Sequence, residues 1–171
     1  MTELLNKEMK LNHLLKEMQS VVIAYSGGVD SSLVLKKAID VLGVKNVKPV
    51  VVKSELFRNE EFYQAIELVR SLGVEVLETE MAELEDDNIV KNTPESSYFS
   101  KRLLYGKLNE IKEEFNFNYI LDGMIMDDLE DFRPGLKARD EFGVRSVLQE
   151  AHLYKSEIRE LSKQHDLPVW N

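Results

Sequence analysis

One segment of the sequence has the residue types and the spacing needed to bind a phosphate group. Positions 26–32 read SGGVDSS, follow an apolar, β-branched run at 21–25, and precede a helical pattern. Glycines let the backbone turn tightly and bring its N–H groups close to an anion. The first turn of a helix adds unpaired N–H groups and a positive dipole end, and the serines add hydroxyl donors. We therefore predict an oxyanion cradle between a strand and a helix.

The spacing of these residues excludes two common phosphate-binding motifs. No lysine follows the glycines, as a Walker loop requires, and no third glycine completes a dinucleotide fingerprint. Asp30 places a carboxylate beside the cradle, where it could hold magnesium, a cation that prefers oxygen ligands. The alternative is a plain glycine turn in which Asp30 only caps the helix. We interpret the segment as a phosphate loop and Asp30 as a metal ligand.

A second group of polar residues follows the apolar run at 119–121, which we expect to be the fourth strand. Asp122-Gly123 come directly after it, Asp127 begins an acid-rich run that extends to position 131, and Arg133 follows. In a doubly wound sheet, the ends of the first and fourth strands flank the crevice where the strand order reverses. Asp127 could therefore share the magnesium ion, and Arg133 could neutralise a phosphate or a substrate carboxylate. A solvated acidic loop is the alternative.

The elements that must position these residues alternate between strand and helix patterns. Apolar residues recur at helical spacing in several segments, and the short apolar runs between them are typical of strands buried in a parallel sheet. The sequence therefore predicts an α/β fold, a doubly wound, Rossmann-like parallel sheet of about five strands with helices on both faces. The expected strands are 21–25, 47–52, 74–77 and 119–121, and the expected helices lie near 4–18, 30–43, 59–73, 104–115 and 155–165.

The composition narrows the class of protein. The 171 residues carry 31 acidic and 22 basic side chains, for a formal net charge of -9, which argues against binding nucleic acid or an anionic membrane through bulk charge. The apolar runs are far too short to span a membrane, so we expect a cytoplasmic protein. The absence of cysteine excludes disulfides, zinc–thiolate sites, iron–sulfur clusters and cysteine nucleophiles within these residues. The length fits one domain.

Residues 26–32 resemble the pyrophosphate-binding loop, Ser-Gly-Gly-x-Asp-Ser, of the PP-loop ATP pyrophosphatase superfamily. The resemblance implies that ATP is cleaved between its α and β phosphates and that a substrate oxygen becomes adenylated, with ATP and Mg2+ as cofactors. Adenine would lie over the end of the second strand. The residues that we expect to bind the nucleotide are Ala24, Ser26, Gly27, Gly28, Asp30, Ser31, Ser32, Val52, Ser54 and Gly123, and those that we expect to be catalytic are Asp30, Asp127 and Arg133.

Further segments resemble one branch of that superfamily, the ATP-dependent sacrificial sulfur transferases (LarE family). Arg133-Pro134-Gly135 and Gly143-Val144-Arg145-Ser146 select this branch, and the resemblance covers essentially the whole chain. It implies that ATP adenylates a carboxylate of a pyridinium mononucleotide and that sulfur from a cysteine is then transferred to it. In this family the product is a precursor of the nickel-pincer nucleotide cofactor of lactate racemase. The family often assembles into rings, so a homo-oligomer is expected.

The sequence departs from this family at two places. Ser97 and Ser100 occupy the positions of a Cys-x-x-Cys pair that binds an iron–sulfur cluster in some members, so no iron–sulfur cluster is expected. In the family, Trp170-Asn171 precede the sulfur-donating cysteine and a further small domain. We therefore expect residues 1–171 to be the PP-loop ATP pyrophosphatase domain of a truncated chain. Two alternatives stay open: an amide-forming ATP pyrophosphatase, as in NAD or GMP synthesis, and a non-catalytic adenine-nucleotide-binding module.

Overall fold

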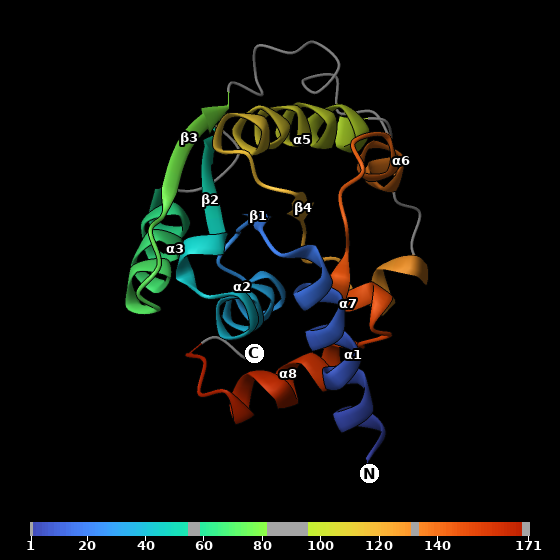
Figure 1. The fold of residues 1–171 in the computed structure, drawn as a ribbon. Coiled ribbons are helices and arrows are strands. Elements are labelled where there is room, and N and C mark those ends of the chain that lie inside the picture. The colour runs from blue at the N-terminus through green and yellow to red at the C-terminus, as the bar shows by residue number, and fades with distance from the viewer. Residues whose placement is uncertain (1, 55–58, 82–95, 131–133, 169–171) are drawn as a thin grey trace.

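The computed structural model describes residues 2–54, 59–81, 96–130 and 134–168. Within these ranges, strands and helices alternate along the chain (Figure 1). None of the described helices combines the length and the apolar character that crossing a membrane requires. The strands are β1 (Val21–Ala24), β2 (Val47–Ser54), β3 (Leu77–Met81) and β4 (Tyr119–Leu121). The α-helices are α1 (Glu3–Met18), α2 (Val29–Leu42), α3 (Asn59–Ser71), α5 (Ser96–Phe115), α6 (Pro134–Glu141), α7 (Val147–Glu150) and α8 (Lys155–Gln164), with short 3-10 helices at Val44–Asn46 and Met126–Glu130.

The four described strands form one parallel sheet in the order β3-β2-β1-β4. Val21 of β1 is paired with Val47 of β2 on one side and with Tyr119 of β4 on the other. The chain moves outward from β1 to β2 and β3 and then returns to the opposite side of β1, so the strand order reverses between β1 and β4. The predicted doubly wound α/β fold is confirmed, and its crevice lies where these two strands end.

The sheet differs from the prediction in its third strand and in its number of strands. The sequence predicts a strand at 74–77, but β3 spans Leu77–Met81, and its residues alternate between half-buried and exposed before Met81. β3 is an edge strand that pairs with β2, so it does not need the continuous apolar run of a central parallel strand. About five strands are expected, whereas the described residues form four. Arg145 adds only an isolated parallel bridge to Leu121.

Side chains alternate across the central strand and build a core on each face of the sheet. Val21 and Ile23 pack into a cluster with α1, α2, α3, α7 and α8, while Val22 packs into a second cluster with α5 and α6. Tyr105 and Leu108 of α5 are fully buried in the second cluster. Figure 1 shows the same division, with α5 and α6 on one side of the sheet and α1, α2 and α8 on the other.

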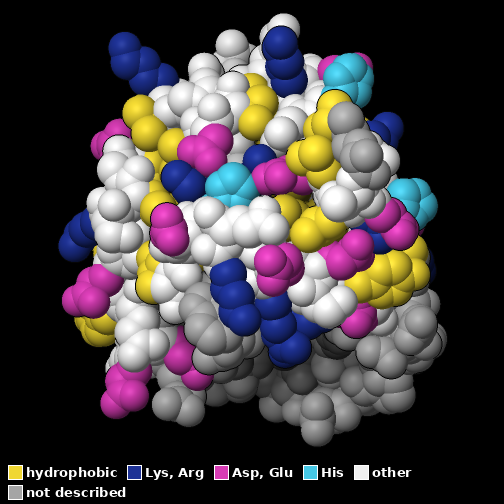
Figure 2. All heavy atoms as spheres, turned by 90° about the horizontal axis from the view of Figure 1, so that it is seen from below, with side chains coloured by type: hydrophobic (Ala, Val, Ile, Leu, Met, Phe, Trp, Pro, Cys, Tyr) yellow, Lys and Arg dark blue, Asp and Glu magenta, His cyan; other side chains and the backbone are white. Residues whose placement is uncertain are grey.

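Ion pairs fasten α8 to α1 and α2. Near the start of α8, Glu157 accepts two hydrogen bonds of 2.9 Å from the Lys7 ammonium. At the end of α8, His165 Nε2 lies 2.6 Å from Oε2 of Glu8 in α1. The same Glu8 oxygen lies 3.0 Å from Nζ of Lys37 in α2, whose side chain is only 5% exposed. Figure 2 views this side of the molecule, where acidic and basic side chains are interspersed over the surface. These contacts hold the last described helix against the helix that follows the phosphate loop.

Replacing Glu8 by glutamine should destabilise the fold, because the buried ammonium of Lys37 would lose its carboxylate partner. We expect the free energy of unfolding at neutral pH to fall by about 2 kcal/mol in urea denaturation. Burial by itself would raise the pKa of Glu8, but the hydrogen bonds from His165 and Lys37 outweigh it and leave that pKa lowered. The stabilisation is therefore present above the unfolded-state pKa and is lost as the pH falls through the lower, folded-state pKa.

Glu17→Gln is the matched control for this prediction. It alters the His13–Glu17 pair, which is also a histidine–glutamate contact of α1 but has both side chains 64% exposed. The free energy of unfolding should change by less than about 0.5 kcal/mol. Equal losses in the two variants would contradict a special role for the buried pair.

Candidate functional site

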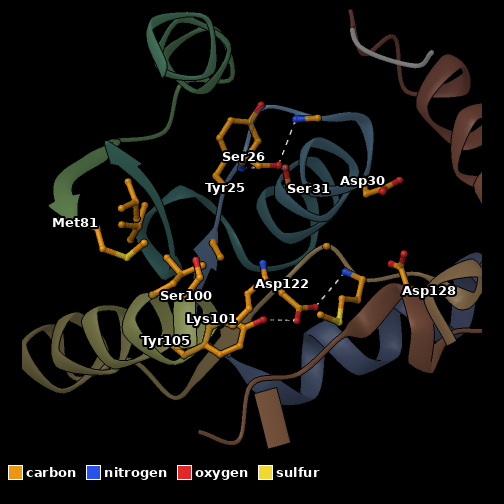
Figure 3. A pocket seen from close by; sticks show the side chains of 17 residues that line it. Tyr25, Ser26, Asp30, Ser31, Met81, Ser100, Lys101, Tyr105, Asp122 and Asp128 are labelled. Carbon is orange, nitrogen blue, oxygen red and sulfur yellow. Dashed lines mark hydrogen bonds between the residues drawn. The ribbon is translucent and has the colours of Figure 1, made fainter. Parts of the chain in front are cut away.

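A cavity of about 400 Å³ lies where the carboxyl ends of β1, β2 and β4 meet the start of α2 (Figure 3). The phosphate loop and the strand ends supply part of its wall, and α5 supplies the opposite part. The structure therefore brings three separate predicted segments together: the loop, the end of the second strand, and the residue after Asp122. The predicted nucleotide-binding residues that line the cavity are Ala24, Ser26, Gly28, Asp30, Ser31, Val52 and Gly123.

Hydrogen bonds within the phosphate loop fix its shape. The Ser31 hydroxyl lies 3.0 Å from Ser26 Oγ and accepts a 3.2 Å hydrogen bond from the Ser26 amide. α2 begins at Val29, and Gly28 occupies its N-cap position without a side-chain cap. Asp30 lies in the first turn, so the alternative that Asp30 only caps the helix is wrong. The first amides of α2 therefore lie beside the cavity without a side-chain acceptor, an arrangement that favours an anion.

Two glycines are required by the close approaches in this site. Gly27 has a φ of +85°, and a Cβ there would lie 3.2 Å from the Cβ of Ala65 in α3. A Cβ at Gly123 would lie 3.2 Å from the backbone nitrogen of Ser31. The end of β4 therefore passes directly against the first turn of α2, and glycine permits this approach because it has no side chain.

Asp30 forms an ion pair with Lys155, the first residue of α8. Lys155 Nζ lies 2.8 Å from both carboxylate oxygens of Asp30. Burial raises the pKa of Asp30, the Lys155 ammonium opposes that rise, and the nearby carboxylates of Asp128 and Asp127 add to it, so the pKa is raised overall. The ammonium therefore offsets only part of the free energy needed to keep a carboxylate ionised here.

Lys155 is a site residue that the sequence patterns do not predict. A lysine in the first turn of a helix is repelled by the positive end of the helix dipole. Helix stability therefore does not explain why a lysine stands at position 155. Its main chain is also fixed, because the Lys155 amide donates a 3.0 Å hydrogen bond to Asp127 Oδ1. An unfavourably placed lysine, in a sequence with an acidic phosphate loop, is the signal that could have marked it.

The acidic residues after β4 act as hydrogen-bond acceptors for the main chain. Asp127 accepts from the Lys155 amide, and Asp128 Oδ2 accepts a 2.9 Å hydrogen bond from the Ile125 amide. Among the residues that the structure describes, no group of three Asp, Glu or His is arranged to hold a metal ion. Asp30 and Asp127 therefore stay predictions as magnesium ligands, and Asp30 is the one that lines the cavity.

Several predicted residues do not contribute a described side chain to the cavity. Ser32 is fully buried beneath the phosphate loop, where its hydroxyl lies 2.8 Å from that of Tyr25, so it supports the loop from below. Ser54 ends β2, and its side chain lies outside the described residues. Arg133, the side chain of Ser97 and residues 170–171 also lie outside them. Gly27 lines a neighbouring hollow between the loop and α3.

The family model for NAD synthase matches residues 3–103, a span that contains the phosphate loop. The chain belongs to the NAD synthase family. This family is part of the PP-loop superfamily, so the resemblance of residues 26–32 to a PP-loop is confirmed. In this NAD synthase family member, the loop lies at the switch point of the sheet, where the doubly wound fold places ligand sites.

One relative is similar to this NAD synthase family member over the whole chain. The pyridinium-3,5-bisthiocarboxylic acid mononucleotide synthase of Lactiplantibacillus plantarum is 48% identical over 171 residues, which is 100% of this chain and 62% of the relative. The resemblance to the LarE family is therefore confirmed. The chain spans less than two thirds of that relative's length.

Solved structures of NAD synthetases share the fold. The glutamine-dependent NAD+ synthetase from Acinetobacter baumannii, in complex with ADP, aligns with a TM-score of 0.75 at 20% identity, covering 99% of this chain and 34% of that chain. The NH3-dependent NAD synthetase from Campylobacter jejuni aligns with a TM-score of 0.70 at 20% identity, covering 96% of this chain and 74% of that chain. These likenesses establish the Rossmann-like architecture.

Gly123→Ala should destabilise the protein, because the added Cβ would lie 3.2 Å from the Ser31 backbone nitrogen, which cannot move without shifting the phosphate loop. We expect the free energy of unfolding in urea to fall by about 2 kcal/mol. Gly106→Ala is the matched control, because the nearest atom to a Cβ there is Phe142 Cζ at 4.0 Å. Inside α5, alanine should stabilise by up to about 1 kcal/mol. Wild-type stability of Gly123→Ala would contradict the close approach.

Proposed function

We propose that this chain supplies the ATP-binding and adenylation part of a sulfur transferase that acts on a pyridinium mononucleotide, in biosynthesis of the nickel-pincer nucleotide cofactor of lactate racemase. The observation that carries the proposal is the cavity at the start of α2, where Asp30 lines the wall and pairs with Lys155. The 48% identity to a mononucleotide synthase supports the choice of substrate. In this proposal residues 1–171 form the PP-loop ATP pyrophosphatase domain of a cytoplasmic, homo-oligomeric enzyme.

The two ends of the cavity suit the two ends of ATP. At one end, the amides at the start of α2 and the hydroxyls of Ser26 and Ser31 can donate hydrogen bonds to phosphate oxygens. At the other end, the apolar side chains of Val52 and Leu104 offer contact to the face of a base. We therefore place the β and γ phosphates on the loop and adenine over the end of β2.

Asp30 would hold magnesium beside these phosphates. Carboxylate oxygens suit this ion, and the Lys155 ammonium already places a positive charge against both oxygens of Asp30. Magnesium at nucleotide sites is usually held by one or two carboxylates together with phosphate oxygens, so three acidic side chains are not required. Asp127 is the second proposed ligand. When bound, the ion would neutralise phosphate charge, and Lys155 could then pair with a phosphate oxygen instead.

Adenylation needs no nucleophile from the protein. A carboxylate oxygen of the substrate attacks the α-phosphorus, the bond to the β-phosphate bridging oxygen breaks, and pyrophosphate leaves with the bonding electrons. The residues of the cavity would hold the triphosphate in line and neutralise its charge, with Arg133 assisting. The 171 residues contain no cysteine, so the transferred sulfur would come from a donor outside them.

Amide formation is the second candidate, because the NAD synthase family model matches and NAD synthetases share the fold. Both reactions begin with an acyl-adenylate and differ in the nucleophile that follows, which is sulfur or ammonia. The identity of 48% to the mononucleotide synthase, against 20% to the NAD synthetases, favours sulfur transfer. A non-catalytic module would bind the nucleotide but release no pyrophosphate.

Asp30→Asn should remove most of the rise in melting temperature that ATP and magnesium produce, because an amide is a much weaker ligand for the cation. Without nucleotide, the variant should lose little stability, because burial raises the pKa of Asp30 and ionisation of this side chain therefore does not favour the folded state. Asp40→Asn on the same helix, which alters the Lys36–Asp40 pair, should keep the full nucleotide shift. Absence of any shift in the wild type would contradict the nucleotide site.

Pyrophosphate release separates the candidate reactions. The complete protein is incubated with ATP, magnesium and the pyridinium-3,5-dicarboxylic acid mononucleotide, the oxygen counterpart of the product in the relative's name. We expect pyrophosphate to form in the absence of ammonia. Pyrophosphate formed only with ammonia and a different acid would favour amide formation, and nucleotide binding without any pyrophosphate would favour the non-catalytic module.

A further inference from the structure

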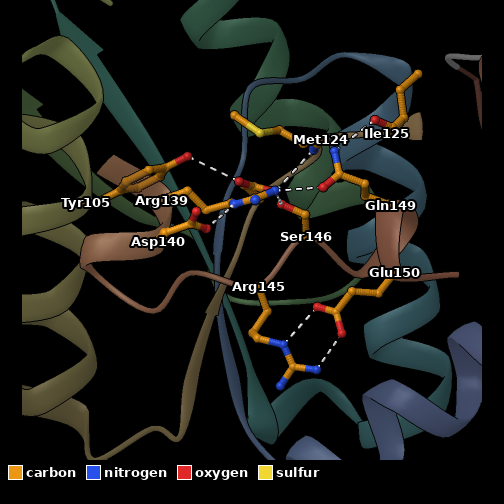
Figure 4. Close-up of polar contacts among 10 residues, drawn as sticks. Tyr105, Met124, Ile125, Arg139, Asp140, Arg145, Ser146, Gln149 and Glu150 are labelled. Carbon is orange, nitrogen blue, oxygen red and sulfur yellow. Dashed lines mark hydrogen bonds and ion pairs between the residues drawn. The ribbon is translucent and has the colours of Figure 1, made fainter. Parts of the chain in front are cut away.

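A buried carboxylate forms part of the cavity wall and takes no part in the chemistry described above. Asp122 directly follows β4, is 5% exposed and lines the cavity. Its Oδ1 accepts hydrogen bonds of 2.7 Å from the Ser146 hydroxyl and 3.1 Å from the Met124 amide, and its Oδ2 accepts one of 3.1 Å from the Tyr105 hydroxyl (Figures 3 and 4). The three donors to Asp122 are neutral hydroxyl and amide groups, whereas both oxygens of Asp30 accept from the Lys155 ammonium.

The hydrogen bonds of Asp122 continue into a longer network (Figure 4). Arg139 Nη1 donates to Ser146 Oγ at 3.2 Å and to Gln149 Oε1 at 2.7 Å. Gln149 Nε2 in turn donates a 3.1 Å hydrogen bond to the Ile125 carbonyl oxygen. The network holds the segment after β4 at two main-chain atoms, the Met124 amide and the Ile125 oxygen. This Asp122 network consists of the side chains of Tyr105, Asp122, Arg139, Ser146 and Gln149.

The segment held by the Asp122 network contacts two helix starts at the phosphate end of the cavity. One is the start of α2, which supplies amide donors, and the other is the start of α8, which supplies the Lys155 ammonium. On one side, Gly123 packs against the first turn of α2 at Ser31. On the other side, the Met126 amide donates to the Leu153 carbonyl at 3.0 Å, and Asp127 accepts from the Lys155 amide. A shift of residues 122–127 would therefore displace the start of α8 relative to the start of α2.

The energetics of Asp122 point to a role other than stability. Burial raises its pKa, while the hydrogen bonds from Ser146, Met124 and Tyr105 and the charge of Lys101 oppose the rise without cancelling it. A buried carboxyl group for which burial outweighs the hydrogen bonds adds little to folding, and an apolar side chain of similar volume often does as well. The carboxylate instead fixes the positions of its neighbours, because it accepts hydrogen bonds from α5, from residue 146 and from its own loop.

We propose that Asp122 is a positioning residue for nucleotide binding. By accepting hydrogen bonds from Tyr105 and Ser146 it fixes the segment 122–127, and through that segment it sets Lys155 against the phosphate loop. This role rests on the proposed function in one respect, that the cavity binds an adenine nucleotide.

Two tyrosines of α5 give a matched pair of variants. Tyr105 donates to Asp122 at the cavity, whereas Tyr98 donates at 2.8 Å to the carboxylate of Glu141 in an exposed contact. Tyr105→Phe should weaken the binding of AMP and of ATP with magnesium about threefold, and Tyr98→Phe should leave both within about 1.5-fold of the wild type. Asp122→Asn should weaken binding about tenfold, because an amide presents one acceptor oxygen to three donors. Dissociation constants are measured by calorimetry at a temperature where each variant is folded.

Hydrogen exchange separates positioning from a general effect on stability. Without nucleotide, Tyr105→Phe and Asp122→Asn should speed amide exchange within residues 122–128 and leave β1 and β2 protected as in the wild type. A residue that only adds to global stability would instead speed exchange through the whole core.

Wild-type affinity and wild-type exchange in folded Tyr105→Phe and Asp122→Asn would overturn the positioning role and leave the nucleotide site intact. If Asp122→Asn does not fold, Tyr105→Phe decides by the same two measurements. Failure of the wild type to bind any adenine nucleotide would overturn the proposed function and, with it, the role of Asp122 in binding.

Discussion

The pairing of β1 with a parallel strand on each side is the constraint on which the site depends. It places the carboxyl ends of β2, β1 and β4 at one edge of the sheet. Because the chain leaves β1 through α2 on one face and reaches β4 through α5 on the other, none of the described connections crosses the gap between these strand ends. The phosphate loop and Gly123 form the two sides of that gap, so the cavity follows from topology before any side chain is considered.

The local parts of this arrangement could be predicted from the sequence, because short-range rules govern them. A strand, a glycine turn and a helix start are encoded within residues 21–32, and most of the predicted nucleotide residues line one cavity. One exception within the motif, Ser32, has a geometric reason. Ser31 and Ser32 are adjacent in a helix and therefore point about 100° apart, so one faces the cavity and the other is buried against Tyr25. The edge strand β3 lacks the apolar run on which the prediction relied.

Contacts between distant positions could not be predicted in the same way. Lys155 and Asp30 are separated by 125 positions, and Asp122 depends on donors from α5 and from residue 146. The acidic run after β4 is predicted to supply a metal ligand, Asp127, and this stays a prediction. In the structure, Asp122, Asp127 and Asp128 each accept a hydrogen bond from a main-chain amide. Their common role in the structure is to shape the loop that carries them, as short polar side chains often do.

The Asp30–Lys155 pair also has a consequence for how the site distinguishes its ligands. Each charge already has a partner, so a free phosphate group that takes Lys155 leaves a half-buried carboxylate unpaired, and a free cation that takes Asp30 leaves the ammonium unpaired. Only a ligand that brings both charges at once replaces both partners. If the pocket binds ATP with magnesium as proposed, the resting ion pair would favour that complex over a ligand that carries only one of the two charges.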